Sequence, residues 1–349
     1  MGSTDITQRK ADHLDLCATD EVAYRQRTNL LEDVRLVHQS LPDLHVDDID
    51  TSVELFGKKL RAPILIAGMT GGHERAAEVN HTLASIANER GYAFGLGSQR
   101  AMQKNPDSAW TFQVRESAPD VLLLGNVGVV QARETSTEGI EELVQSVGAD
   151  ALCVHMNPAM ELVQPGGDRD FRGGVDTYAR LVKELSVPVI AKETGNGVSG
   201  ETASKLYGVG VRHVDVSGAG GTSWVGVETL RAEGDAKDLG TALWDWGIPT
   251  AASVHLVTQQ GMTAFATGGM RTGVDVARAI ALGASMGGIA RNVFKAFTEG
   301  GREGAETFLT RAEHQLRSVM LLCGARNLDE LRKAPRVITG ELRYWMGMQ

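Results

Sequence analysis

The stretch APILIAGMTGGHERAAE, residues 62–78, decides which fold class this sequence predicts. It begins with a short apolar run that ends in glycines and a threonine, and a stretch with apolar residues three and four positions apart follows. A buried strand that leads into a helix in this way is typical of a parallel β-sheet. The turn lacks the G-x-G-x-x-G pattern that opens a doubly wound dinucleotide-binding sheet, which disfavours that alternative.

The same pattern, a short apolar run followed by a stretch with helical spacing, recurs along the chain. The runs are APILIAGM (62–69), YAFGLGS (92–98), DVLLLGNVG (120–128), ALCVHMN (151–157), VPVIAKET (187–194), HVDVSGAGG (213–221), AFATGGMR (264–271) and SMGGIAR (285–291). A pattern with helical spacing separates each run from the next, often with a glycine after its last turn. Eight strand–helix units within about 230 residues predict an α/β fold of the (β/α)8 TIM-barrel type.

Two segments flank the predicted barrel, which we assign to residues 62–301. Residues 1–61 form an N-terminal extension with a charged helical start, a polar middle and a probable hairpin, SVELFGKKLRAP. Residues 302–349 form a C-terminal helical tail that belongs to the same domain. With no low-complexity segment or linker between these parts, the sequence predicts one domain with decorated ends.

Charge and composition exclude several classes of function. The chain has 349 residues and a formal net charge of −9, so it has no general attraction for nucleic acid or an anionic membrane. No apolar stretch approaches the length of a membrane helix or a signal peptide. The three cysteines are widely spaced, which is typical of reduced thiols in a cytoplasmic protein.

The predicted strands end in polar groups, and the active site of a TIM barrel lies at these ends. The residues there are Met69, Thr70, Ser98, Gln99, Arg100, Asn126, His155, Asn157, Glu161, Lys192, Ser217 to Thr222, Gly269, Arg271, Ala290 and Arg291. This ring holds few carboxylates. It therefore suits a polar, flat, phosphorylated ligand.

The last two strand ends, TGGMRTGVDVARA (267–279) and GGIARNVF (287–294), each join glycines to an arginine before a helix. Backbone N–H groups at such turns bind phosphate, although glycine also simply permits a tight turn. Lys192 ends an otherwise apolar strand and requires a negative partner. That partner is either a neighbouring carboxylate or a ligand anion, such as the anionic edge of a reduced flavin.

The segment HMNPAMELVQPGGDRDF, residues 155–171, follows the fourth strand. Magnesium commonly takes one or two carboxylates together with substrate phosphates, so Glu161 is the candidate metal ligand. His155 and Asn157 are candidate hydrogen-bond partners of a phosphate. The alternative for Glu161 is a first-turn acid that satisfies helix N–H groups.

The N-terminal segment contains a compact charged cluster, Arg9, Lys10, Asp12 and His13. Such a cluster is usually a solvated helix start. The alternative is a flap that closes a diphosphate into the barrel mouth.

Ordered motifs extend over nearly the whole chain. They are RKADH, GMTGG, GSQRAM, NVG, HxNPxxExxQPxGDRDF, KETGNG, SGAGGTSW and TGGMRTGxDVARAIALGA. Together they resemble the type 2 isopentenyl diphosphate isomerases, which are similar to FMN-dependent (β/α)8 enzymes. The resemblance implies interconversion of isopentenyl and dimethylallyl diphosphate with reduced FMN and Mg²⁺, and with NADPH as the reductant of the flavin. It also implies a homo-oligomer, a tetramer or an octamer.

The resemblance assigns roles to individual residues. The implied FMN-binding residues are Gly68, Met69, Thr70, Ser98, Asn126, Lys192, Ser217, Thr222, Gly269, Met270, Arg271, Ala290 and Arg291. The implied substrate-binding residues are Arg9, Lys10, Ser98, Gln99, Arg100, His155, Asn157 and the position of Met160, with Glu161 as the Mg²⁺ ligand. Lys192 and His155 are the candidate catalytic residues.

Met160 departs from the family pattern, which has glutamine immediately before the metal-binding glutamate. A thioether is a poor replacement for an amide that takes part in proton relay. Two other functions therefore stay open. One is an FMN-dependent oxidoreductase that consumes NAD(P)H on a related phosphorylated substrate, and the other is a binding barrel without catalysis.

Overall fold

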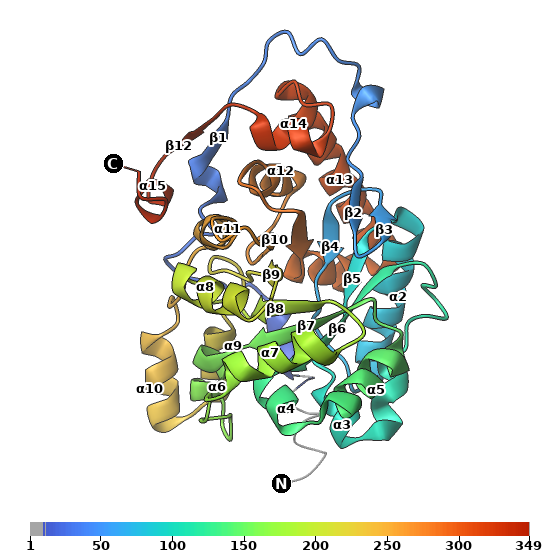
Figure 1. Cartoon of the computed structure of the whole chain (residues 1–349), viewed down its shortest axis with the longest axis vertical. Helices are drawn as coiled ribbons and strands as arrows, with labels where there is room; N and C mark the ends of the chain where they lie inside the picture. The colour runs from blue at the N-terminus through green and yellow to red at the C-terminus, as the bar shows by residue number, and fades with distance from the viewer. Residues whose placement is uncertain (1–9, 11, 349) are drawn as a thin grey trace.

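Eight parallel strands form a closed barrel in the computed structural model, which describes residues 10 and 12–348 (Figure 1). The strands are β4 (Ile64–Ile66), β5 (Ala93–Gly95), β6 (Leu122–Gly128), β7 (Ala151–Met156), β8 (Val189–Glu193), β9 (His213–Asp215), β10 (Thr263–Thr267) and β11 (Met286–Ile289). Each strand pairs with the next along the chain, and β11 closes on β4. Every predicted run overlaps one of these strands, so the predicted (β/α)8 barrel is confirmed.

Helices surround the barrel on its outer side (Figure 1). They are α2 (Glu74–Arg90), α3 (Arg100–Lys104), α4 (Val129–Glu134), α5 (Thr137–Val147), α6 (Pro158–Val163), α7 (Gly174–Glu184), α8 (Gly200–Gly208), α9 (Trp224–Arg231), α10 (Gly234–Ala242), α11 (Thr250–Thr258), α12 (Gly273–Ala281), α13 (Arg291–Leu322), α14 (Leu328–Lys333) and α15 (Leu342–Trp345). Local sequence explains several helix ends. Ser136 and Ser199 accept N-terminal N–H groups of α5 and α8, and Gly148 ends α5 in the left-handed conformation.

Two hydrophobic layers follow from the period of two along each strand. Leu122 and Leu124 of β6 point into the barrel and belong to an interior cluster that also contains Phe265 of β10. Leu123, between them, belongs to the larger cluster that the helices cover. The interior is therefore a packed core and not a pore.

The extension covers the N-terminal end of the barrel with a hairpin. Strands β2 (Val53–Leu55) and β3 (Lys58–Leu60) are antiparallel neighbours, as predicted. The ring of Phe56, at the turn, lies edge-on to His213 at a centroid distance of 4.7 Å. Lys58 Nζ lies 2.9 Å from Asp150 Oδ2, and Arg115 contacts the same oxygen. This end is thus filled by aromatic and paired charged groups.

The tail begins within α13, whose regular geometry breaks at Gly300 and Gly301. This break lies at the predicted end of the barrel segment. Further on, β12 (Arg336–Ile338) pairs with β1 (Val34–Leu36) in an antiparallel sheet, so the tail and the extension are joined. The predicted division into extension, barrel and tail stays a prediction. Among the residues that the structure describes, no helix is both long enough and apolar enough to cross a bilayer.

The interior layer predicts a large stability effect at Phe265, which is completely buried. Phe265→Ala removes most of a ring from a closed barrel that cannot collapse around the gap. We expect the free energy of unfolding to fall by about 3–5 kcal/mol, measured by urea unfolding. Val337→Ala, at a side chain that is 54% exposed, is the control and should change it by no more than about 0.5 kcal/mol. Equal effects of the two substitutions would contradict this layering.

Candidate active site at the carboxyl ends of the barrel strands

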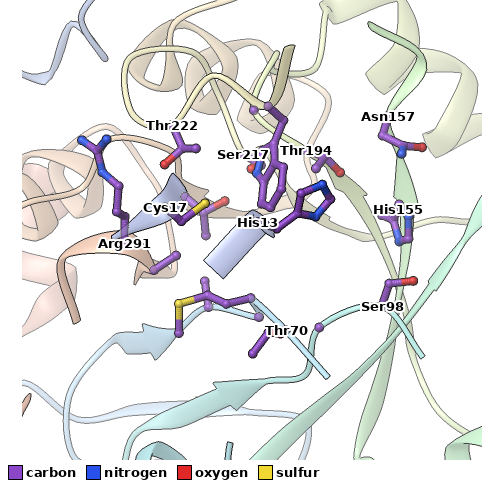
Figure 2. Close-up of a pocket in the computed structure, with 18 of the residues that line it drawn as sticks. His13, Cys17, Thr70, Ser98, His155, Asn157, Thr194, Ser217, Thr222 and Arg291 are labelled. Carbon is purple, nitrogen blue, oxygen red and sulfur yellow. The ribbon is translucent and has the colours of Figure 1, made fainter. Parts of the chain in front are cut away.

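Above the apolar interior, the next inward-facing position on several strands is polar. Asn126 follows Leu124 by two residues, and Thr267 follows Phe265 by two. His155 and Lys192 occupy the equivalent positions on β7 and β8 and are cross-strand partners. All four line one cavity at the carboxyl ends of the strands, and Figure 2 labels His155 there beside Ser98 and Asn157.

The structure brings most of the predicted site residues to this cavity. Those that line it are Lys10, Gly68, Met69, Thr70, Ser98, Arg100, Asn126, His155, Asn157, Met160, Glu161, Lys192, Ser217, Thr222, Gly269, Met270, Arg271, Ala290 and Arg291. Arg9 lies outside the described residues. These residues come from all eight strand ends and from the N-terminal segment, although they are spread over nearly 300 residues of the chain.

Gln99 differs from its predicted place in the substrate site. Its side chain is fully buried and is not among the groups that line the cavity. Oε1 accepts the backbone N–H of Asn126 at 2.9 Å, and Nε2 donates to the carbonyl oxygen of Leu143 at 3.2 Å. Because both ends of the amide bind the barrel wall, Gln99 supports Asn126 from behind.

The cavity carries an excess of positive charge. Five basic side chains line it, and Glu161 is the only carboxylate among the described residues that do so. The basic residues are Lys10, Arg100, Lys192, Arg271 and Arg291. Such an arrangement in a confined space favours a ligand with several negative charges.

His155 is neutral in this environment. Burial lowers the pKa of His155 to about 3, and the nearby cations Lys192, Lys10 and Arg100 act in the same direction. Its Nδ1 lies 2.8 Å from Oδ1 of Asn126, whose Nδ2 donates to the carbonyl oxygen of Leu96. In this network Nδ1 carries the proton and Nε2 keeps a lone pair.

Lys192 has a carboxylate partner within the protein. Its Nζ lies 2.9 Å from Oδ2 of Asp215 on β9, and the side chains are 11% and 2% exposed. Burial lowers the pKa of Lys192, but Asp215, together with weaker neighbouring groups, holds this pKa above its usual value. The ion pair that the sequence left as an alternative is therefore present, and Lys192 still lines the cavity.

Glu161 is buried in the first turn of α6 and held by three donors. Its carboxylate accepts Nδ2 of Asn157 at 3.0 Å, Nε2 of Gln164 at 3.2 Å and the backbone N–H of Asp168 at 2.7 Å. Met160, at 9% exposure, places its sulfur 3.8 Å from the same Asn157 nitrogen. No group of three or more His, Cys, Asp or Glu side chains that could hold a metal ion occurs among the described residues.

The glycine-rich turns after β9 and β10 pack against each other. A Cβ atom on Gly221 would lie 2.3 Å from the backbone N of Gly269, and one on Gly268 would lie 2.1 Å from the carbonyl oxygen of Gly218. Gly268 and Gly269 also have positive φ angles, which disfavour any larger residue. Mutual packing therefore explains these glycines, while Gly221 and Gly269 still line the cavity.

Residues 22–29 of the extension cross these turns; we call this segment the strap. Ser223 N donates to the carbonyl oxygen of Val22, and Tyr24 N donates to that of Gly221. Asn29 Nδ2 donates to the carbonyl oxygen of Gly269 at 2.7 Å. The strap thus fixes both glycine-rich turns.

The helical segment before the strap, residues 12–17, also reaches the cavity. Lys10 Nζ donates to the carbonyl oxygen of Ser98 at 3.2 Å. His13 Nε2 lies 2.8 Å from Oε1 of Glu228, whose side chain is inaccessible to solvent, and its ring lies edge-on to Trp224. Figure 2 shows His13 and Cys17 within the cavity. The charged cluster is therefore no solvated helix start at these positions.

Comparison with known families matches residues 3–156 and 163–338 to the family described as FMN-dependent dehydrogenase. The isopentenyl-diphosphate delta-isomerase of Methanothermobacter thermautotrophicus is 43% identical over 346 residues, which cover 99% of this chain and 97% of the relative. That of Thermococcus kodakarensis is 47% identical over 348 residues, covering 97% and 93%. The chain belongs to the isopentenyl-diphosphate delta-isomerase family.

More distant solved structures share the fold of this isomerase-family enzyme. A mandelate oxidase variant with a monooxide FMN adduct superposes with a TM-score of 0.64 at 17% identity, covering 93% of this chain and 95% of the other. A lactate oxidase of Pediococcus acidilactici gives a TM-score of 0.67 at 14% identity, covering 97% and 95%. At these identities the likeness shows the fold alone.

Three side chains in or next to this isomerase-family site were not among the predicted residues. Asp215 stands in the run HVDVSGAGG, and a charged residue inside a buried strand was its available signal. Thr194 lines the cavity one residue beyond β8. Asn29 gave no signal, because its contact with Gly269 joins positions 240 residues apart.

The state of His155 predicts a pH dependence of stability for this isomerase-family chain. Its pKa in the folded protein, about 3, lies below the unfolded value of about 6.5, so the unfolded chain binds the extra proton between these pH values. The stability that the neutral His155 contributes to the folded protein is complete above pH about 6.5 and is lost as the pH falls toward about 3. We expect His155→Gln to reduce the loss of unfolding free energy between pH about 7 and 5 by about 2 kcal/mol in urea titrations without ligand.

The exposed His38 provides the control for this prediction. His38→Gln should leave the pH dependence as in the wild type. An unchanged slope in His155→Gln would mean that His155 is charged in the folded protein.

Proposed function

We propose that this protein interconverts isopentenyl diphosphate and dimethylallyl diphosphate with the assistance of reduced FMN and Mg²⁺. The relatives named isopentenyl-diphosphate delta-isomerase support the isomerisation. The observation that carries the proposal is the cavity itself. Among the described residues, it joins five basic side chains to a single carboxylate at the mouth of a barrel whose family is FMN-dependent. A diphosphate and a phosphorylated flavin are ligands of the matching charge.

The residues around the cavity fit FMN. Within the described part of the chain, the buried atoms Thr70 Oγ1 and Arg291 Nη1 have no hydrogen-bond partner, and both residues line the cavity. Unpaired buried donors are costly, so a polar ligand stabilises them. The FMN-binding residues that we propose are Gly68, Met69, Thr70, Ser98, Asn126, Lys192, Ser217, Thr222, Gly269, Met270, Arg271, Ala290 and Arg291.

The substrate diphosphate has a basic and hydrogen-bonding wall available. We assign it to Arg9, Lys10, Ser98, Arg100, His155 and Asn157. The contact between Lys10 and Ser98 supports a flap that closes over this wall. Arg100 Nε is buried and without a partner among the described residues, which leaves a donor for a phosphate oxygen. An anion beside His155 raises the pKa of this imidazole, because it favours the protonated form.

Glu161 is the proposed Mg²⁺ ligand. The donors from Asn157, Gln164 and Asp168 fix its carboxylate. Mg²⁺ commonly takes one or two carboxylates together with substrate phosphates and water, so the diphosphate would share the ion with Glu161.

The chain's own contribution to the chemistry is binding, orientation and exclusion of water. When bound, reduced FMN supplies weakly acidic and basic ring atoms that exchange a proton with the substrate. We propose that Lys192 provides a fixed cation beside the flavin and that His155 orients the diphosphate. Leu14, Met160 and Trp224 line the same cavity and provide an apolar environment for the hydrocarbon end. The reaction is redox-neutral, and NADPH serves only to reduce the flavin.

We further propose that the protein acts in the cytoplasm as a homo-oligomer. Its cysteines, Cys17, Cys153 and Cys323, are free thiols, which is consistent with a reducing compartment.

A second function is favoured by the family match to FMN-dependent dehydrogenases. It is an oxidoreductase that consumes NAD(P)H on a related phosphorylated substrate.

One assay separates the two functions. Purified protein is reconstituted with FMN, isopentenyl diphosphate, Mg²⁺ and a catalytic amount of NADPH. We expect dimethylallyl diphosphate to form with negligible net oxidation of NADPH, followed by NMR and by absorbance. Glu161→Gln removes the charge at the metal site and should reduce the rate by at least about 100-fold. Consumption of NADPH in proportion to product would favour the oxidoreductase instead.

The role of Met160 is tested by substitution. Met160→Gln introduces the amide of the family pattern, and we expect an equal or up to about tenfold higher isomerase rate, since proton-relay groups contribute at least this much. Met160→Leu keeps an apolar side chain of similar size and should match the wild type. A large loss of rate in Met160→Gln would show that the thioether packs productively against the substrate.

A further inference from the structure

A line of side chains crosses three adjacent strands inside the barrel. Lys192 of β8 and Asp215 of β9 are cross-strand partners, and Nζ lies 2.9 Å from Oδ2. Thr267 of β10 donates its hydroxyl to Oδ1 of Asp215. Lys192 and Thr267 line the cavity, whereas Asp215 lies behind them at 2% exposure.

Both oxygens of Asp215 are occupied. Oδ1 accepts the Thr267 hydroxyl and the backbone N–H of Ser217 at 3.3 Å, and Oδ2 faces Lys192. A carboxylate in this state is a poor general base, because its lone pairs already serve other donors. Asp215 instead provides a fixed negative charge behind the Lys192 ammonium.

The other ionisable groups around Lys192 do little to replace the negative charge of Asp215. His155, its partner on β7, is neutral, and Cys153 on the same strand has a pKa raised by burial to about 12. Glu193, the next residue on β8, has a pKa raised by burial to about 8. Burial lowers the pKa of Lys192, and Asp215 is the strongest of the groups that raise it.

We propose that Asp215 is a positioning residue that keeps Lys192 protonated and directed along the cavity wall, with Thr267 fixing the carboxylate. This role extends the proposed function, since it makes the flavin-side cation depend on a residue that touches no ligand. A buried lysine helps to bind an anionic ligand only while it is protonated, and here the Asp215 carboxylate stabilises the protonated form of Lys192.

The first test measures the pKa of Lys192 without any ligand. Competitive acetylation across a pH series, read by mass spectrometry, reports the ionisation of this amine in the apoprotein. We expect Asp215→Asn to lower the pKa of Lys192 by at least about two units relative to the wild type. A structural role alone would lower the melting temperature without moving this pKa, and an unchanged pKa overturns the proposal.

The second test measures FMN affinity of the apoprotein at pH about 7 and about 9.5. In Asp215→Asn the affinity should fall about tenfold over this interval, because Lys192 loses its proton, while the wild type changes less than about twofold. Adding Lys192→Met should abolish the pH dependence. Wild-type protein that binds no FMN would contradict the proposed function, whereas the acetylation result still decides the role of Asp215.

A matched control lies at the other end of the barrel. Asp150 pairs with Lys58 and Arg115 and is remote from the cavity. Asp150→Asn should reduce stability but leave the pKa of Lys192 and the pH dependence of FMN affinity unchanged. If Asp215→Asn does not fold, Thr267→Val removes only the supporting hydroxyl. A lowered Lys192 pKa in that variant supports the proposal, and an unchanged one overturns it.

Discussion

Alternation of side chains along a barrel strand constrains the rest of this molecule. An eight-stranded barrel has just enough interior to be filled by its own inward side chains. Lower inward positions such as Leu124 and Phe265 fill it with hydrocarbon. The next inward positions, two residues later, are Asn126 and Thr267 and open into the cavity. These polar groups consequently lie directly above an apolar layer, which we call the apolar floor of the cavity. Charges and hydrogen bonds have strong effects in such surroundings.

That floor explains the electrostatic pattern of the cavity. His155 is neutral because its surroundings are buried and already cationic. Lys192 is charged because Asp215 reaches it from the neighbouring strand. Two basic side chains on adjacent strands thus have opposite protonation states. Burial and nearby cations lower the pKa of His155, whereas Asp215 supports the already higher pKa of Lys192. An anionic ligand shifts the balance further, since it offsets the repulsion among the remaining cations.

Much of this organisation could be predicted from the sequence, because it depends on local patterns. Each of the eight strands gave an apolar run followed by polar residues, and residues such as Ser98 and Arg291 were found by their position at strand ends. Contacts between distant segments gave no such signal. Gln99 follows a strand like its neighbours, but its side chain turns into the wall to bind Asn126 and Leu143. The strap and the β1–β12 pairing likewise depend on tertiary contacts.

The β1–β12 sheet has a consequence for how the molecule is assembled during synthesis. β1 continues from the strap that holds the glycine-rich turns, but its partner β12 lies about 300 residues later in the chain. All eight barrel strands leave the ribosome before β12 does. The barrel can therefore close while β1, which continues from the strap, still lacks its strand partner. A chain interrupted after the barrel would have the walls of the binding site before it had the sheet that secures the strap.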